Sequence, residues 1–226
     1  MSPERTGFLY PFLEAEERDH AGLLRDLAAS AAAKTAESDE LRRATLARLD
    51  ADLDAAAVAM AGRFAAGGHL LAFGNGGSST DAAGLAACFL TAPEDAPGRS
   101  LPARSLAEDP AVLTALGNDV GFDVVFARQL AAFGGDRDIA VGLSTSGSSE
   151  NLLQAFAVAR KRGMLTIGLA GGDGGRMAAA DIDHCFVVRA TSIHRIQETQ
   201  AAVGAELWAR THRSLASGDP RRGNRT

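Results

Sequence analysis

Five short apolar runs, separated by segments with helical spacing, constrain the fold of this chain more than any other feature. Most of the runs are apolar at consecutive rather than alternate positions, which is typical of strands covered on both faces. The pattern predicts an α/β fold, a three-layer α/β/α sandwich around a five-stranded parallel sheet. The predicted strands are 69–74, 101–107, 138–144, 164–170 and 181–188, and the predicted helices are 78–91, 110–117, 121–133, 150–162 and 193–216.

The first 66 residues differ from the rest because they show helical spacing without any strand-like run. Apolar residues from Phe12 to Leu27 lie near one side of a first predicted helix. Ser38-Asp39-Glu40 predicts the N-terminal cap of a second helix, which stops at Gly67-Gly68. Helices this long need an apolar partner, and we expect a bundle between subunits.

Three segments follow from this division. Residues 1–66 are expected to form a helical extension that packs on the domain and on other subunits. Residues 67–216 are expected to form the single ligand-binding domain, and residues 217–226 a flexible tail.

Charge and cysteine content exclude several classes of protein. The chain of 226 residues has a net charge of −5, so no basic field indicates a nucleic-acid partner. Cys88 and Cys185 lie far apart in apolar surroundings, which does not suggest a disulfide framework. No signal peptide or membrane span is recognisable, so we expect a cytoplasmic protein without a membrane partner.

A loop rich in hydroxyl groups joins a predicted strand to a predicted helix. Residues 142–151 read GLSTSGSSEN and hold four serines and a threonine within six residues. Hydroxyls and free N–H groups at a helix start form an anion-binding site. The loop has no lysine, so it is not the GxxxxGK[ST] nucleotide loop. A phosphate on a small molecule is the expected ligand, and an ordinary serine-rich turn is the alternative.

A second loop, GNGGS at residues 74–78, has the same position after the first predicted strand. Glycine-rich turns between strands and helices are common, so this loop alone is weak evidence. Ligands of such sheets bind where loops leave the carboxyl ends of the strands. Together the two loops predict a phosphate site beside a polyol site.

Five motifs, GNGGSSTDA, LGNDVGF, GLSTSGSSEN, AGGDGGRMA and HRIQE, occur in this order. In this order and spacing the chain resembles the sugar isomerase (SIS) fold and, more narrowly, the phosphoheptose isomerase family, over roughly residues 50–216. The resemblance implies a sugar phosphate ligand and a homo-oligomer, a dimer or tetramer with pockets at subunit interfaces. Relatives without catalytic activity exist, including an adaptor in bacterial replication initiation.

The resemblance also implies a set of ligand contacts. The serine loop would hold the phosphate, and the remaining residues would contact the sugar. The substrate-binding set is Asn75, Gly76, Gly77, Ser78, Asn118, Asp119, Ser144, Thr145, Ser146, Ser149 and Gln197.

The residues that carry catalysis in the family are not retained. By resemblance, a histidine, a glutamate, a glutamine and a second histidine are expected at positions that hold Gly84, Cys88, Gln197 and Ala205 here. Proton transfer between two sugar carbons needs an acid–base group, which Gly, Ala and an amide do not supply. Zinc takes His, thiolate or carboxylate ligands, usually four, and Cys88 with Gln197 is too few. We therefore expect no cofactor and no metal.

Whether the chain is an enzyme stays open. The main hypothesis is a phosphosugar-binding sensor or adaptor that lacks isomerase chemistry and has a protein partner. The alternative is an active sedoheptulose 7-phosphate isomerase with a rebuilt site, in which His194, three residues before Gln197, acts as the catalytic group. A polar histidine at a loop–helix junction is the structural explanation of the same residue. A purely structural interaction protein is the third hypothesis, which the intact serine loop disfavours.

Overall fold

The computed structural model describes residues 20–91 and 99–217. The chain divides into two compact units between Glu40 and Leu41, and each unit is described by itself. The predicted tail falls outside the described residues from position 218 onward, as do Phe12 and Ala15 of the first predicted helix.

The N-terminal region is a single helix, α1 (His20–Ala65), so the predicted cap at Ser38 is wrong. No glycine or proline occurs between Gly22 and Gly62, and alanine, the best helix former, recurs throughout this stretch. Ser38 and Asp39 favour caps, but their cost inside a helix is a few tenths of a kcal/mol each, about the ordinary spread of propensities. A cap signal without a chain-breaking residue therefore does not end the helix.

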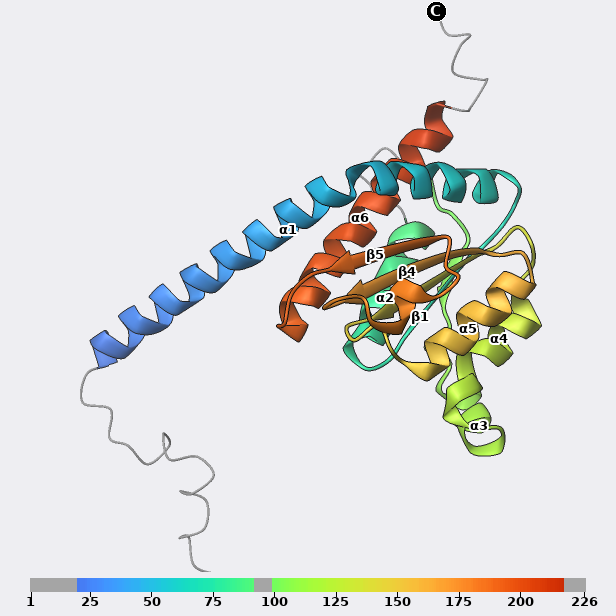
Figure 1. Cartoon of the computed structure of the whole chain (residues 1–226), viewed down its shortest axis with the longest axis horizontal. Helices are drawn as coiled ribbons and strands as arrows, with labels where there is room; N and C mark the ends of the chain where they lie inside the picture. Colours follow the sequence, from blue (N-terminus) through green and yellow to red (C-terminus); the bar gives the residue numbers. More distant parts are fainter. Residues whose placement is uncertain (1–19, 92–98, 218–226) are drawn as a thin grey trace, which may run out of the picture. The chain divides into compact units, whose positions relative to one another are not determined.

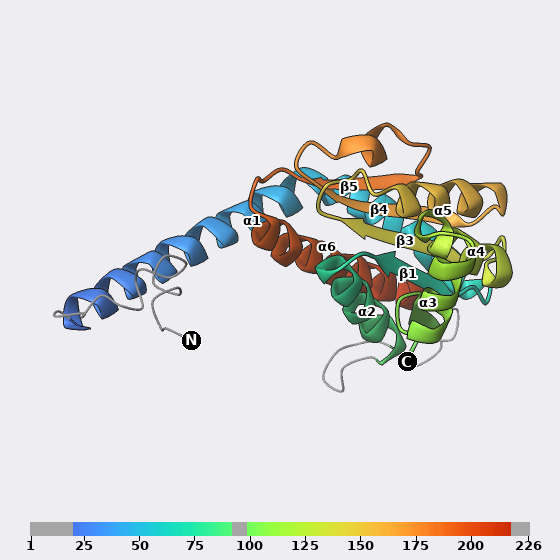
Figure 2. The same ribbon diagram turned by 90° about the horizontal axis from the view of Figure 1, so that it is seen from below.

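The unit that begins at Leu41 contains a sheet of five parallel strands in the order β2-β1-β3-β4-β5 (Figures 1 and 2). In the central pair, Leu70 of β1 aligns with Ile139 of β3, and Gly74 aligns with Leu143. The predicted fold class is confirmed, since every observed strand lies within or overlaps a predicted run. The strands are β1 (Leu70–Gly74), β2 (Ala103–Ser105), β3 (Ile139–Ser144), β4 (Leu165–Gly171) and β5 (His184–Val188).

Helices cover both faces of the sheet. Leu70 and Ala72 of β1 point into one apolar cluster with α2, α6 and the C-terminal half of α1. Leu71 and Phe73 point into a second cluster with α4 and α5 on the opposite face (Figure 2). The helices are α2 (Gly77–Leu90), α3 (Pro110–Asp119), α4 (Val125–Phe133), α5 (Glu150–Lys161) and α6 (Ile193–Ser217), with short 3₁₀ turns η3 (Phe122–Val124) and η4 (Gly175–Ala179).

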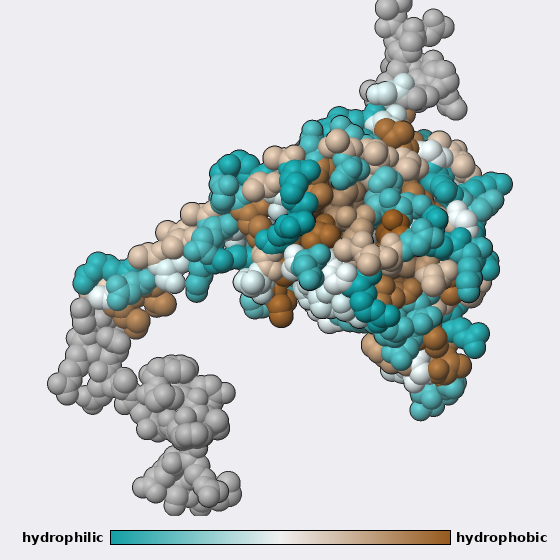
Figure 3. Space-filling view, in the orientation of Figure 1, coloured by the Kyte–Doolittle hydropathy of each residue, from teal (hydrophilic) through white to brown (hydrophobic). Residues whose placement is uncertain are grey.

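No helix in the described part of the chain is long and apolar enough to cross a membrane. Figure 3 shows polar residues spread over the face that it presents, with apolar residues in separate smaller areas.

A charged cluster joins α6 to the C-terminal half of α1. Arg210 donates hydrogen bonds to Asp50 (2.7 Å, carboxylate), Asp54 (2.8 Å) and Glu206 (3.0 Å). The Arg210 side chain is only 12% exposed, whereas those of Asp50 and Asp54 are 65% exposed. Burial alone would lower the pKa of Arg210, but the three carboxylates outweigh it and raise that pKa. The guanidinium therefore stays charged and holds the two helices together.

We predict that Arg210→Met lowers the free energy of unfolding by about 1–2 kcal/mol, because charged hydrogen bonds are lost while the exposed carboxylates stay hydrated. Urea unfolding at low salt measures this loss. Arg128→Met, which changes an exposed arginine of α4, is the matched control and should stay within about 0.5 kcal/mol of the parent. Equal stabilities of the two variants would contradict the role of the cluster.

Candidate functional site

The register of the central strands brings the two predicted loops together. Gly74 ends β1 beside Leu143, and the next residue of β3 is Ser144. Asn75 and Asn151 then exchange two amide hydrogen bonds, each 2.9 Å from nitrogen to oxygen. The glycine loop after β1 is thereby fixed to the first turn of α5, which the serine loop enters.

Three hydroxyl groups converge in the serine loop. Ser144 Oγ lies 3.3 Å from Ser146 Oγ and 3.2 Å from Ser149 Oγ, and it accepts a hydrogen bond from the Gly147 N–H at 3.1 Å. Ser144 is 4% exposed, Ser149 and Thr145 are half-buried, and Ser146 is exposed. Hydroxyls can rotate to donate, and the start of α5 adds the positive end of a helix dipole. The loop can therefore receive an anion at its exposed side.

The glycine-rich loop after β4 packs against the serine loop. Gly147 has a φ of +62°, and a Cβ there would lie 2.1 Å from the carbonyl oxygen of Gly174, so only glycine fits. Met177 N–H donates to the Gly147 carbonyl at 2.8 Å, and Arg176 N–H donates to Ser148 Oγ at 3.2 Å. These contacts hold the serine loop in one conformation before any ligand binds.

Gln197 lies against the start of α2. A Cβ on Gly77 would be 2.3 Å from Gln197 Nε2, so the missing side chain makes room for the amide. Gly76 has a φ of +55°, which turns the chain sharply into the helix. Ser78 is buried in the first turn of α2. The half-buried Gln197 thus borders the glycine loop.

Three residues of the predicted site make no hydrogen bond to the serine loop or the glycine loop among the described residues. Asn118 and Asp119 are exposed at the end of α3 and bond to each other, Asn118 Nδ2 to Asp119 Oδ1, at 2.8 Å. His194 is exposed in the first turn of α6, one turn before Gln197. No hydrogen bond among the described residues joins any of the three to the two loops.

The positions that differ from the family pattern lie on the exposed side of α2 and α6. Gly84, Cys88 and Ala205 are all exposed. Together with Gln197, these positions offer one thiol, one amide and no imidazole, a donor set that does not fit zinc. Within the described ranges, no three His, Cys, Asp or Glu side chains are grouped so that they could hold a metal ion.

Three polar residues near the loops, of which Asn151 and Gln200 are buried and Asp81 is half-buried, were missed at the sequence level. Asn151 binds Asn75, and Gln200 is fully buried with its Nε2 3.4 Å from the Ser144 carbonyl oxygen. Asp81 lies one turn into α2, and burial raises the pKa of its carboxyl. Asp81 stands four residues after Gly77, so helical spacing alone could have placed it on the site's side of α2.

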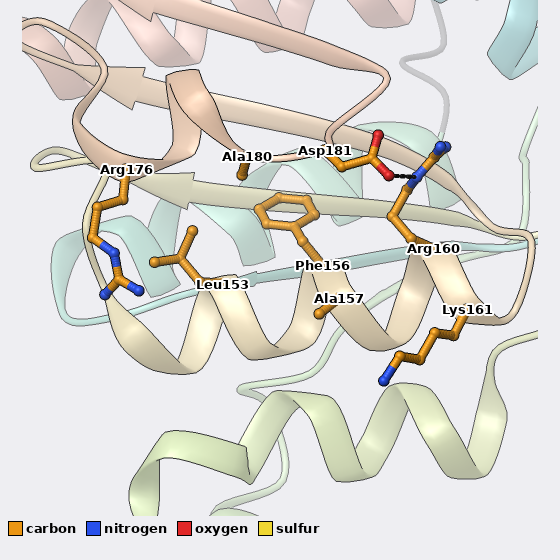
Figure 4. Close-up of a pocket in the computed structure, with 8 residues that line it drawn as sticks. All are labelled: Leu153, Phe156, Ala157, Arg160, Lys161, Arg176, Ala180 and Asp181. Atoms are coloured by element: carbon orange, nitrogen blue, oxygen red, sulfur yellow. Dashed lines mark hydrogen bonds and ion pairs between the residues drawn. The ribbon is translucent and has the colours of Figure 1, made fainter.

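A separate hollow of about 460 Å³ lies between α5 and the segment after β4 (Figure 4). Leu153, Phe156 and Ala157 form part of its lining. Arg160 at one end is paired with Asp181 at 3.2 Å, and Arg176 at the other end with Glu150 at 2.6 Å. These two arginines are therefore paired with carboxylates of the same chain.

Comparison with known proteins gives a consistent result. The sequence profile of the SIS domain matches residues 35–171. The chain is 46% identical over 153 residues to the phosphoheptose isomerase of Solidesulfovibrio magneticus, covering 67% of this chain and 73% of the relative. It is 47% identical over 163 residues to that of Chlorobaculum tepidum, covering 71% and 78%.

Solved structures agree with the sequence relatives. A phosphoheptose isomerase from Neisseria gonorrhoeae superimposes with a TM-score of 0.72 at 36% identity, covering 80% of this chain and 96% of that one. A phosphoheptose isomerase from Francisella tularensis superimposes with a TM-score of 0.76 at 31% identity, covering 82% and 98%.

We predict that the Asn75–Asn151 pair stabilises the fold cooperatively. A double-mutant cycle with both alanine variants should give a coupling free energy of about 1–2 kcal/mol in urea unfolding, because either single change leaves the amide of the partner unpaired, and Asn151 is buried. The exposed Asn118–Asp119 pair is the control and should couple by less than about 0.5 kcal/mol. Strictly additive effects at Asn75 and Asn151 would show that the loops are held by other contacts.

Proposed function

Because the chain belongs to the SIS domain family and, within it, to the phosphoheptose isomerase family, we propose that it binds a sugar phosphate without isomerising it and acts as a sensor or an adaptor. Its relatives are named phosphoheptose isomerases, so a heptose phosphate is the first ligand to test.

The convergence of three serine hydroxyls at Ser144 is the observation that carries the binding half of this proposal. A phosphate group presents three acceptor oxygens, and each hydroxyl of the loop can donate to one of them. The polar groups of Gln197 and the glycine loop lie beside this position and suit the hydroxyls of a sugar.

The residue types at Gly84, Cys88 and Ala205 support the second half of the proposal. Aldose–ketose isomerisation moves a proton between adjacent carbons, which needs a positioned acid or base. Gly84 and Ala205 have no such group, and Cys88 is an exposed thiol. We infer that the ligand is held but not converted, and that binding itself is the output that a protein partner reads.

Isomerase activity through His194 is the competing function, favoured by identities of 40–47% to the relatives named isomerases. His194 is exposed and lies one turn before Gln197, on a neighbouring position of the same helix. A ligand between the loops and α6 would have to reach this imidazole for the alternative to hold.

We also propose that the protein works in the cytoplasm as a homodimer or homotetramer. Small residues on the exposed side of α2 and α6, among them Gly84, Ala87, Ala201 and Ala205, would let a second subunit approach closely. Light scattering tests the assembly, and a monomer at micromolar concentration would remove this part of the proposal.

We predict that Ser144→Ala with Ser149→Ala weakens binding of sedoheptulose 7-phosphate by about 100-fold, since two hydrogen bonds to a charged group are lost at about 1.5 kcal/mol each. Isothermal titration calorimetry measures the loss. Ser214→Ala, on the C-terminal part of α6, is the control and should bind like the parent. Unchanged affinity in the double variant would show that the phosphate binds somewhere other than the serine loop.

We predict that the protein does not exchange the C1 or C2 protons of sedoheptulose 7-phosphate with solvent. Proton NMR in D₂O should show the ligand signals broadened by binding, with their intensities retained. Exchange, or the appearance of the aldose, would establish the isomerase instead. His194→Ala would then show whether that histidine carries the activity.

A further inference from the structure

Two acceptor oxygens are buried without a hydrogen-bond partner among the described residues of the chain. One is Asp81 Oδ2 on α2, and the other is Gln200 Oε1 on α6. A buried acceptor that has lost water and gained no donor is destabilising, and native proteins rarely leave one unpaired. Two such atoms on two helices that pack together call for a common explanation.

Contacts on both sides of these atoms fix how α2 and α6 are aligned. A Cβ on Gly77 would lie 2.3 Å from the Gln197 side chain, so these two residues are opposite each other. Two turns further on, a Cβ on Gly204 would lie 3.0 Å from the Leu85 side chain. The helices therefore run in the same direction, with about the same number of residues between the two contacts.

Asp81 and Gln200 occupy the turn between those contacts. Asp81 comes four residues after Gly77 and four before Leu85, so it lies on the same side of α2. Gln200 and Ala201 follow Gln197 by one turn on α6. Ala201 is exposed whereas Gln200 is fully buried, so of these two residues Gln200 is the one on the packed side of α6.

The orientation of the Gln200 amide is set by the serine loop. Its Nε2 lies 3.4 Å from the carbonyl oxygen of Ser144, and a carbonyl can only accept. The amide oxygen of Gln200 must then face away from Ser144. An ionised Asp81 would place a second acceptor against it, whereas a protonated Asp81 would supply the missing donor.

We propose that Asp81 is a positioning residue of the serine loop that acts in its protonated form, its carboxyl O–H donating to Gln200 Oε1 while Gln200 Nε2 donates to the Ser144 carbonyl. This relay joins α2, α6 and the end of β3 directly beneath the three converging hydroxyls. Loss of the proton sets two acceptors against each other, loosens Gln200 and weakens sugar phosphate binding. The inference rests on the proposed function for its ligand.

The surroundings of Asp81 are consistent with an uncharged carboxyl. Burial raises its pKa, and no cation is among the causes of that shift. The strands β1 and β3 against which α2 packs contain no ionisable side chain. On β2, Arg104 stacks over the ring of Phe133 at 4.1 Å. On the neighbouring turns of α2 and α6, the ionisable groups are Cys88 and His194, both exposed, together with Arg195 and Glu198.

The first test uses stability and needs no ligand. A carboxyl with a raised folded-state pKa contributes stability that is present below its unfolded pKa of about 3.9 and is lost as pH rises through the folded value. Asp81→Asn supplies a donor that does not titrate. Urea unfolding from pH 4.5 to 8 should therefore show the parent losing stability relative to Asp81→Asn as pH rises.

Glu198→Gln is the matched control, because it neutralises an exposed carboxyl on α6. The difference in free energy of unfolding between Glu198→Gln and the parent should stay constant as pH rises. A parent and an Asp81→Asn variant with parallel stability profiles over the whole range would overturn the proposal.

The second test measures affinity for sedoheptulose 7-phosphate by calorimetry at pH 5.5 and pH 8. The ratio of the parent Kd to the Asp81→Asn Kd cancels the titration of the phosphate itself. We expect a ratio near one at the lower pH and a rise of about three- to tenfold at the higher pH, while Asp81→Ala binds weakly at both. A ratio that stays constant would overturn the link to binding.

The two experiments distinguish a failure of the proposed function from a failure of the Asp81 proposal. If neither protein binds the sugar phosphate, the proposed function is wrong, and the stability profiles still decide whether Asp81 holds a proton. If Asp81→Asn does not fold, Gln200→Leu replaces it, because this variant removes the acceptor. The stability advantage of the parent over Gln200→Leu should then shrink as pH rises, and an advantage independent of pH would overturn the proposal.

Discussion

The parallel pairing of β1 with β3 is the constraint on which the rest of this site depends. It brings Gly74 beside Leu143, so the two loops that follow leave the same edge of the sheet. The Asn75–Asn151 bonds and the Gly147–Gly174 contact then join these loops and the loop after β4 into one surface. Because each contact is between main-chain or short side-chain groups, the surface is formed before a ligand arrives.

The site combines groups suited to binding an anion with helix positions that carry no acid or base. The serine loop keeps its hydroxyls and its glycine, which are the features that a phosphate needs. On α2 and α6, Gly84 and Ala205 stand where the resemblance to the family implies histidines. A loop can keep its ligand under this change, because anion binding uses hydroxyls and N–H groups and does not require a group that titrates near neutral pH.

Much of the fold could be predicted, since apolar runs mark buried parallel strands and their spacing leaves room for helices. The continuous α1 could not, because Ser38-Asp39-Glu40 has the chemistry of a cap whether or not the helix ends there. In the site, Gln197 was expected beside the glycine loop and lies there. The resemblance to the family suggested Asn118 and Asp119 as sugar contacts. A motif does not show which of its residues lie close together within one subunit.

By itself the sequence determined the sheet and the two loops, because these follow from local apolar patterns and from glycines. Only the tertiary structure decided that Asn151 binds Asn75, that the loop after β4 contacts Gly147, and that Asp81 and Gln200 each bury an oxygen without a partner among the described residues. Those relations depend on the alignment of helices far apart in the chain. The groups that pack against a polar atom decide whether it is hydrogen-bonded. Its neighbours in the sequence do not specify those groups.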